Sequence, residues 1–505
     1  MGPSCRAASS RRDHAVSLRG AACRSDPAMS ADHTLDNLQT IPWVSCKPYP
    51  RVPANCTLGM WERLVASCRE TRGTSSGRAH VDTGPAVGVE YRARLIDASV
   101  AEALETAGAV VIEGPRACGK TMTALNAARS YVFLDDPGVA QMIDVAPEAL
   151  LDGARPRLLD EWQLAPELWN LTRRAVDRAA APGQFILTGS SVPPDDATRH
   201  SGAGRFLRLR QRTLTWQERD GAVVGGVSLR GLFDRREVAA TSSDALGLPE
   251  VLERVTASGF PAMAGLTVDR QRRLLVAYLE EVSRTDVRTV GDVRHDPAVI
   301  RRLIAALARN TAAPVSYATL AADMTAVAPD IKSTTVAAYV RVLERLFLVE
   351  RQQAWTPRLR SRARLRSSDK LHLADPALAA AALGADAEQL HRDVETAGLL
   401  FESAVFHDLS VLVDRLGGEV RHYRDSNGLE MDGVLLLPDG RWAPVEVKLG
   451  GGRIADAARS LNAALDVIDT SAVGAPAFRL IVTGTGSTFT LDDGTVTVPL
   501  HRLLP

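Results

Sequence analysis

The apolar positions between residues 89 and 222 form short, nearly continuous runs separated by longer amphipathic stretches. Four runs have the length of buried strands, and the stretches between them repeat their apolar residues at helical spacing. The runs lie at residues 109–113, 131–134, 157–160 and 184–188. This alternation predicts an α/β fold, in which helices cover a mostly parallel sheet and a ligand binds at the carboxyl ends of the strands.

The pattern becomes largely helical between residues 223 and 375. Segments 269–287 and 297–311 carry apolar residues at positions i, i+3, i+4 and i+7. A short helix, a turn, a second helix and a strand follow, and Ser333 is the expected N-cap of the second helix. The buried stripe of that helix is expected at Val336, Val340, Leu343 and Phe347. This order is similar to a winged helix-turn-helix, a fold that either binds DNA or serves as a packing module.

Residues 376–505 combine a long apolar helix, expected at about 395–416, with a set of strands. Turns at Asn427-Gly428 and Asp439-Gly440 separate three of these strands, which indicates antiparallel hairpins. A second α/β domain is therefore expected here. Residues 1–88 are rich in Arg, Ser, Pro and Gly and show no sustained period, so they are predicted to be a disordered extension.

The length of 505 residues exceeds what one ordinary core can hold, so several domains are expected. Lys plus Arg and Asp plus Glu each number 60, and the chain therefore has no overall field that would attract nucleic acid. A local patch could still do so. Arginines recur with period 2 at Arg358, Arg360, Arg362, Arg364 and Arg366. On a strand they would share one face, which favours phosphate binding slightly over a charged, aggregation-protected edge.

Targeting signals and cysteine pairs give no sign of secretion. No apolar run approaches the roughly 20 residues that span a bilayer, and the first residues lack the apolar core of a secretory signal. Five of the six cysteines fall within the first 68 residues without a CxxC pair, which argues against a zinc site or a disulfide framework. A cytoplasmic protein with no membrane contact is the prediction.

The segment EGPRACGKT, residues 113–121, has the spacing GxxxxGK[ST] of a phosphate-binding loop between a strand and a helix. Backbone amides of such a loop surround phosphate oxygens, the lysine reaches the β and γ phosphates, and the hydroxyl ligates Mg²⁺. ATP and Mg²⁺ are the expected cofactors. The predicted binding residues are Gly114, Pro115, Arg116, Ala117, Cys118, Gly119, Lys120 and Thr121.

A second acidic strand follows the loop by about forty residues, as nucleotide hydrolysis requires. Asp160 is expected to hold Mg²⁺ together with Thr121, and Glu161 to polarise the attacking water. Thr188 or Ser190 is expected either to bond the water or γ-phosphate or to cap a strand end. Arg205 is predicted to reach a γ-phosphate as an arginine finger, within the chain or from a neighbouring subunit, the alternative being a surface ion pair.

The carboxyl-terminal region carries a further constellation of charged residues. Glu402 lies within the apolar helix, where a buried carboxylate needs a partner. Asp432 and Glu446 are expected on neighbouring strands, where they could hold Mg²⁺, and Lys448 could activate water. The order helix Glu, Asp, Glu-x-Lys is that of the PD-(D/E)XK nuclease superfamily, with Met431 in place of its proline. The alternative is a charged hairpin edge facing water.

The chain resembles a broad prokaryotic family of AAA+-type P-loop ATPases with an uncharacterised carboxyl-terminal region. The likeness covers roughly residues 90–460 and rests on EGPRACGKT together with LLDEWQ (158–163), LTGSS (187–191), GLLFES (398–403) and EMDGVL with VEVK (430–448). It implies ATP binding and a carboxyl-terminal PD-(D/E)XK-like fold.

Two functions are therefore predicted. In the first, an ATPase controls a DNA-binding and DNA-cleaving carboxyl-terminal half. In the second, ATP switches a catalytically inactive nuclease-like scaffold that binds DNA or a protein partner. Oligomerisation is compatible with both.

Overall fold

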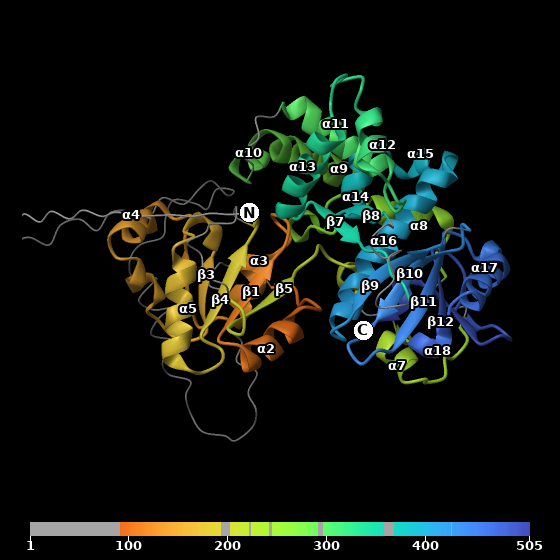
Figure 1. The fold of residues 1–505 in the computed structure, drawn as a ribbon, viewed down its shortest axis with the longest axis horizontal. Helices are drawn as coiled ribbons and strands as arrows, with labels where there is room; N and C mark the ends of the chain where they lie inside the picture. Colours follow the sequence, from red (N-terminus) through yellow and green to blue (C-terminus); the bar gives the residue numbers. More distant parts are fainter. Residues whose placement is uncertain are drawn as a thin grey trace, which may run out of the picture. The chain divides into compact units, whose positions relative to one another are not determined.

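The computed structural model describes residues 91–192, 202–221, 224–241, 245–290, 296–357, 368–425 and 427–505 (Figure 1). The predicted disordered extension, residues 1–88, and the predicted row of arginines from Arg358 to Arg366 lie outside the described residues. Both stay predictions.

The first described region is built on a five-stranded parallel sheet with the strand order β2-β3-β4-β1-β5. Four strands match the predicted ones and confirm the parallel α/β core, whereas β5 was not predicted. The apolar residues of β1, β3 and β4 are buried because helices cover both faces of the sheet. The bounds are β1 (Ala109–Glu113), β2 (Ser130–Phe133), β3 (Arg157–Asp160), β4 (Phe185–Gly189) and β5 (Phe206–Arg210).

The two faces of this sheet pack against different helices (Figure 1). Val110 and Ile112 of β1 contact α2 (Asp97–Thr106) and α3 (Lys120–Ala127), while Val111 contacts α5 (Leu168–Ala179) and the neighbouring Trp162. The short α4 (Pro137–Val145) follows β2. Alternate residues of β1 thus anchor opposite helical layers, as the two-residue period of a strand requires. This packing fixes the loop that joins β1 to α3.

A helical region follows the first sheet. Its elements are α6 (Trp216–Asp220), β6 (Val227–Ser228), α7 (Leu229–Phe233), α8 (Leu248–Thr256), α9 (Val268–Glu281), α10 (Val287–Val290), α11 (Pro297–Arg309), α12 (Tyr317–Asp323), α13 (Ser333–Arg345), β7 (Val349–Gln352), β8 (Lys370–Leu373), α14 (Pro376–Leu383) and α15 (Ala387–Arg392). One π-helical turn, Val282–Asp286, joins α9 to α10. The antiparallel strands β7 and β8 follow α12 and α13 in the predicted order, and the winged-helix assignment stays a prediction.

The last region packs the long helix α16 (Val394–Asp414) against a six-stranded sheet of order β13-β14-β12-β11-β10-β9. Strands β9 to β11 form an antiparallel meander, and β12 and β14 continue it in parallel. The bounds are β9 (Glu419–Arg424), β10 (Glu430–Leu436), β11 (Trp442–Lys448), α17 (Ile454–Asp466), α18 (Thr470–Val473), β12 (Arg479–Thr483), β13 (Phe489–Thr490), β14 (Thr495–Pro499) and β15 (Leu503–Leu504).

The helical region and the last region share one continuous hydrophobic core, although the sequence pattern divides them at residue 375. Strand β6 pairs with β15 at the end of the chain, and α14 packs against α9 and α11. The predicted boundary at 375/376 therefore does not separate two cores. Among the described residues, α16 alone has the length and apolar composition of a membrane span, and most of its residues are buried inside the protein, as in a core helix.

Candidate functional site

Residues 114–119, between β1 and α3, form a tight loop. Gly114 lies so near the carbonyl oxygen of Gln211 that a β-carbon at this position would collide with it. Gly119, the N-cap of α3, has a φ of 100°, and Ala117 has a φ of 63°. Because left-handed backbone turns consecutive N–H groups toward one side, this loop can surround an anion at the helix N-terminus.

Lys120 points its ammonium into this loop. Its side chain is buried, and its Nζ donates to the carbonyl oxygen of Pro115 at 2.8 Å. The phosphate oxygens of a nucleotide would offer this ammonium stronger, charged acceptors at the same place. The residues of the loop therefore fit a nucleoside triphosphate, as the spacing predicts.

Asp160 ends β3 beside the first turn of α3. Its Oδ2 lies 3.3 Å from Thr121 Oγ1, and its Oδ1 accepts a hydrogen bond of 2.5 Å from Thr188. Burial raises the pKa of Asp160 to about 6, against the opposing effect of the Thr188 hydrogen bond. The carboxylate and the Thr121 hydroxyl are the oxygen ligands that Mg²⁺ takes, so this pair fits a magnesium-bound nucleotide.

Glu161 follows in the left-handed conformation, with a φ of 56°. Its N–H donates to Thr188 Oγ1 at 3.0 Å, and its carboxylate accepts from Ser190 Oγ at 2.8 Å and from the amide of Gln163. Backbone of this kind directs a side chain away from the strand and persists only where neighbours hold it. Ser190 and Gln163 thus fix the carboxylate that was predicted to orient water, and Thr188 fixes its backbone. The role of Gln163 was missed, although it stands in the quoted LLDEWQ segment.

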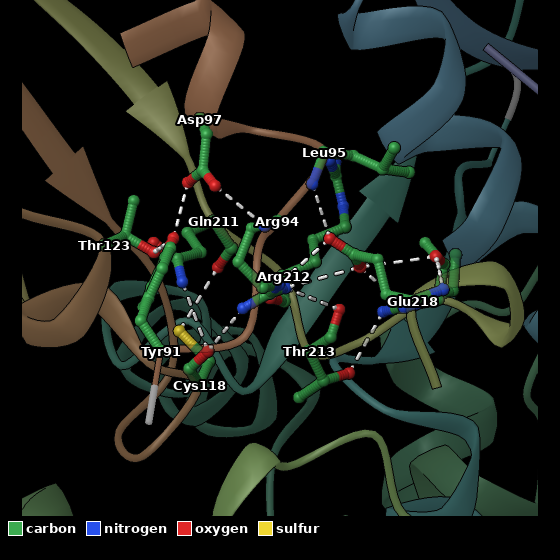
Figure 2. A network of polar contacts seen from close by, with 12 residues as sticks. Tyr91, Arg94, Leu95, Asp97, Cys118, Thr123, Gln211, Arg212, Thr213 and Glu218 are labelled. Carbon is green, nitrogen blue, oxygen red and sulfur yellow. Dashed lines mark hydrogen bonds and ion pairs between the residues drawn. The ribbon is translucent and has the colours of Figure 1, made fainter. Parts of the chain in front are cut away.

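Arg94, which the sequence pattern did not single out, supports the loop from outside (Figure 2). Its Nη1 donates to the Cys118 carbonyl at 3.0 Å, its Nε pairs with Glu218 at 2.9 Å, and its Nη2 donates to the Arg212 carbonyl at 2.9 Å. The buried guanidinium therefore ties the phosphate loop to the chain that follows β5. An arginine in a short segment before α2 carries no signal of such long-range partners.

Arg205 is placed at the wrong end of the sheet for the predicted finger within one chain. The register pairs Ala109 with Phe206 and Glu113 with Arg210, so Arg205 precedes the strand end that is remote from the phosphate loop. Its Nε forms an ion pair of 2.8 Å with Asp177. The structure thus shows the predicted alternative, a surface ion pair. An arginine finger that reaches the nucleotide of a neighbouring subunit stays a prediction.

The residues that follow β5, here called the connecting segment (residues 211–216), contact the phosphate loop. Gln211 Nε2 donates to the carbonyl of Cys118 at 3.2 Å, and the Cys118 thiol donates to the Gln211 carbonyl at 3.4 Å. Two hydrogen bonds thus join Gln211 to the backbone and thiol of Cys118 in the loop.

The same connecting segment bonds the rest of the protein. Arg212 pairs with Glu350 of β7 at 2.9 Å and with Asp414 at the end of α16 at 2.6 Å. Thr213 Oγ1 lies 3.0 Å from His407 Nε2, and the Trp216 N–H donates to Asp408 at 2.9 Å.

Glu350 lies between Arg210 and Arg212, and its carboxyl group is ionised. Burial alone would raise its pKa, but Arg212 and Arg210 outweigh that effect and lower it to about 2. The pair is therefore charged at neutral pH, and in this buried setting it is a strong link between β5 and β7.

The four predicted carboxyl-terminal residues do come together. Asp432 Oδ2 accepts from the Val447 N–H at 2.8 Å, which brings it beside Glu446, and Lys448 Nζ lies 2.7 Å from Glu446 Oε1. Glu402 of α16 approaches the same place. The group of Glu402, Glu430, Asp432 and Glu446 is called the carboxylate site below.

Burial and mutual repulsion dominate the electrostatics of this site. Burial, reinforced by the charge of Asp432, raises the pKa of Glu402 to about 8 and that of Glu446 to about 7. The pKa of Lys448 is also raised, because Glu446 and Asp432 outweigh the effect of burial. Such perturbed groups are typical of functional sites, although structural ion-pair networks perturb pKa values as well.

Lys370 of β8 is the member that the sequence pattern missed. Its ammonium lies 2.7 Å from Glu402, 2.8 Å from Glu430 and 3.8 Å from Asp432. Among the described residues, no three His, Cys, Asp or Glu side chains are arranged to share a metal ion. With the ammonium among these carboxylates, the side chains as they stand do not fit the metal ion predicted for Asp432 and Glu446.

Comparison with known protein families supports a nucleotide-binding type of domain in the region of the first sheet. Residues 106–219 match the family described as an AAA domain, so the chain carries an AAA-type, ATPase-like domain. Residues 249–389 match a domain of unknown function (DUF8612), and residues 397–503 match another domain of unknown function (DUF4143). These two matches show where the two domains lie in the sequence and indicate no activity for them.

Two relatives span most of the chain. They are the uncharacterized proteins Rv2008c of Mycobacterium tuberculosis and Mb2031c of Mycobacterium bovis, each 25% identical over 414 residues, which cover 81% of this chain and 83% of the relative.

Solved structures give weaker matches. The Walker-type ATPase PABY2304 of Pyrococcus abyssi is 13% identical with a TM-score of 0.34, over 57% of this chain and 94% of that one. The FIGL-1 AAA domain in complex with ADP is 14% identical with a TM-score of 0.20, over 58% and 99%. These scores are too low to establish a shared overall fold.

Proposed function

We propose that this protein binds and hydrolyses ATP at the phosphate loop and that the bound nucleotide controls the carboxyl-terminal half. One observation carries the proposal. The connecting segment contacts the loop through Gln211 and, one residue later, pairs Arg212 with Glu350 and Asp414. A displacement of the loop on nucleotide binding would therefore reach β7 and α16 through buried, charged contacts.

The side chains around the loop divide the chemistry among them. Lys120 would hold the terminal phosphates, and Thr121 and Asp160 would hold Mg²⁺, which neutralises phosphate charge when it is bound. Glu161, fixed by Ser190 and Gln163, would orient and polarise the attacking water.

ATP turnover by wild type and Lys120→Ala tests the assignment. The variant should lose turnover and ATP binding, because the loop loses its buried ammonium. Lys332→Ala, which removes an exposed lysine, is the matched control and should hydrolyse ATP like wild type. Hydrolysis by Lys120→Ala at the wild-type rate would remove the phosphate-loop assignment.

A second function is supported by the convergence of Glu402, Asp432, Glu446 and Lys448. They lie on α16, β10 and β11, within the order of one helix, three antiparallel strands, a helix and a parallel strand that is expected for a PD-(D/E)XK-like nuclease domain. We propose that this region acts on DNA, which the winged-helix order before it and the predicted arginine row also favour. A scaffold that only binds DNA or a protein partner is the alternative, and the ammonium of Lys370 in the carboxylate site favours it.

Cleavage of DNA by wild type beside Asp432→Ala, with Mg²⁺ or Mn²⁺ and with or without ATP, distinguishes the two. Cleavage that disappears in Asp432→Ala supports a nuclease. Absence of cleavage in every condition, or equal cleavage by both proteins, leaves the scaffold as the function of this region.

A further inference from the structure

The carboxylate site already contains a cation that belongs to the chain. We infer that the ammonium of Lys370 occupies the position a divalent metal ion would take there and competes with it. This inference rests on the proposed nuclease-like character of the site. It differs from the proposed function because it predicts that the site, as folded, excludes the metal that such a site is expected to bind.

The geometry around Lys370 is that of a bound cation. Its side chain is only 1% exposed, and its Nζ contacts oxygens of Glu402 and Glu430 at 2.7 and 2.8 Å, with Asp432 at 3.8 Å. These carboxylates come from α16 and β10, whereas the lysine comes from β8. A lysine so deeply buried is normally found only where negative charge surrounds it.

Charge balance explains why a metal ion and the ammonium exclude each other. Lys448 already pairs with Glu446 at 2.7 Å, and the half-exposed Arg424 approaches Glu430 only to 3.8 Å, so Lys370 is the nearest counter-charge of Glu402 and Glu430. A divalent ion would need the same oxygens within about 2 to 2.6 Å, and its charge would repel an ammonium that contacts those oxygens. Loss of Lys370 would instead leave several buried carboxylates that repel one another and favour a metal ion.

The position of Lys370 is fixed by its strand. The register pairs Lys370 with Gln352 of β7, and Gln352 Nε2 donates to the backbone carbonyl of Asp432 at 2.7 Å. His372, two residues further on, lies 3.1 Å from Ser403 of α16. The strand pair β7–β8 thus fixes the backbone from which Lys370 reaches the site, and Glu350 on β7 is the residue that Arg212 holds.

Mn²⁺ binding to the full chain without nucleotide or DNA tests this inference, with free Mn²⁺ measured by electron paramagnetic resonance. Wild type should show no Mn²⁺ binding that depends on Asp432, so wild type and Asp432→Asn should titrate alike. Lys370→Met should gain one site with affinity higher by at least roughly ten-fold, since a buried carboxylate group has lost its counter-charge. The gain should vanish in Lys370→Met combined with Asp432→Asn.

A matched lysine variant controls for the loss of a positive charge elsewhere in the protein. Lys332→Met removes an exposed lysine and should bind Mn²⁺ like wild type, while Mn²⁺ should raise the melting temperature of Lys370→Met alone. A folded Lys370→Met that binds Mn²⁺ no more tightly than wild type overturns the inference. So does a wild-type site that Asp432→Asn abolishes, a comparison that holds even if Lys370→Met does not fold. Failure of ATP turnover or of DNA cleavage changes neither titration.

Discussion

Arg212 Nε lies 2.9 Å from Glu350 Oε2, although 138 residues separate them in the chain. Arg212 follows the strand beside the phosphate loop, and Glu350 lies on the strand that pairs with the one carrying Lys370. Both side chains are largely buried, and Arg210 and Asp414 extend the pair. The Arg212–Glu350 ion pair and the pairing of β7 with β8 thus connect the segment beside the phosphate loop with the strand that carries Lys370.

Removal of either member of the Arg212–Glu350 pair should destabilise the folded protein. Arg212→Ala and Glu350→Ala should each lower the free energy of unfolding by about 3 kcal/mol, because each removes the nearest opposite charge of a largely buried group. The double variant should cost less than the sum of the two, as measured by urea denaturation. The exposed pair of Arg392 and Glu388 is the matched control and should give a far smaller change. Additive effects at Arg212 and Glu350 would mean that they do not interact.

Arg94 should position the phosphate loop without touching the nucleotide. Arg94→Met removes the bond to the Cys118 carbonyl, so it should raise the KM for ATP more than it lowers kcat, by about ten-fold. Arg94→Lys should recover part of the loss, since one donor returns. The exposed Arg92→Met should leave both constants unchanged. Equal constants in Arg94→Met and wild type would contradict the positioning role.

Glu161 and its neighbours should matter for turnover and little for binding. Glu161→Gln should bind a fluorescent ATP analogue like wild type and lose turnover by a factor of about 100 or more. Ser190→Ala should show a smaller loss in the same direction, because Gln163 still holds the carboxylate. If Glu161→Gln hydrolyses ATP at the wild-type rate, another group activates the water.

His372 should make stability depend on pH. Burial, reinforced by the charge of Lys370, lowers its pKa from 6.5 to about 3. The unfolded chain binds this proton below pH 6.5 and the folded chain does not until about pH 3, so stability falls as pH decreases through that window. His372→Gln should reduce the slope between pH 6 and 4 by up to about 1.4 kcal/mol per pH unit.

The matched control for this pH experiment is His391→Gln, which replaces an exposed histidine and should keep the wild-type slope. Unfolding free energies from urea titrations at several pH values give the comparison. An unchanged slope in His372→Gln would mean that this residue is protonated equally in both states.

Most of the first sheet and the phosphate loop could be predicted from local sequence patterns. Four strands were predictable because each is a short apolar run, and the loop because eight consecutive residues define it. Strand β5 is FLRLR, in which two arginines interrupt the apolar run, so it was missed. That omission explains why a finger within one chain was considered for Arg205: without the register of β5 against β1, nothing shows at which end of the sheet Arg205 lies.

The carboxyl-terminal site was predictable only in part. Glu402, Asp432, Glu446 and Lys448 follow a known order along the chain, so they could be expected to converge. Lys370 has no such pattern, since its partners come 32, 60 and 62 residues later, on α16 and β10. The boundary at residue 375 failed for a similar reason, because the core that crosses it depends on tertiary packing.

The central claim is that a nucleotide at the phosphate loop alters β7 and α16 through the connecting segment. Hydrogen exchange of the full chain with and without a non-hydrolysable ATP analogue and Mg²⁺ tests it most directly. The account predicts that the analogue changes exchange at the loop, β7 and α16 in wild type, and only at the loop in Glu350→Ala. Protection of the loop in wild type with identical exchange of β7 and α16 in both conditions would contradict it.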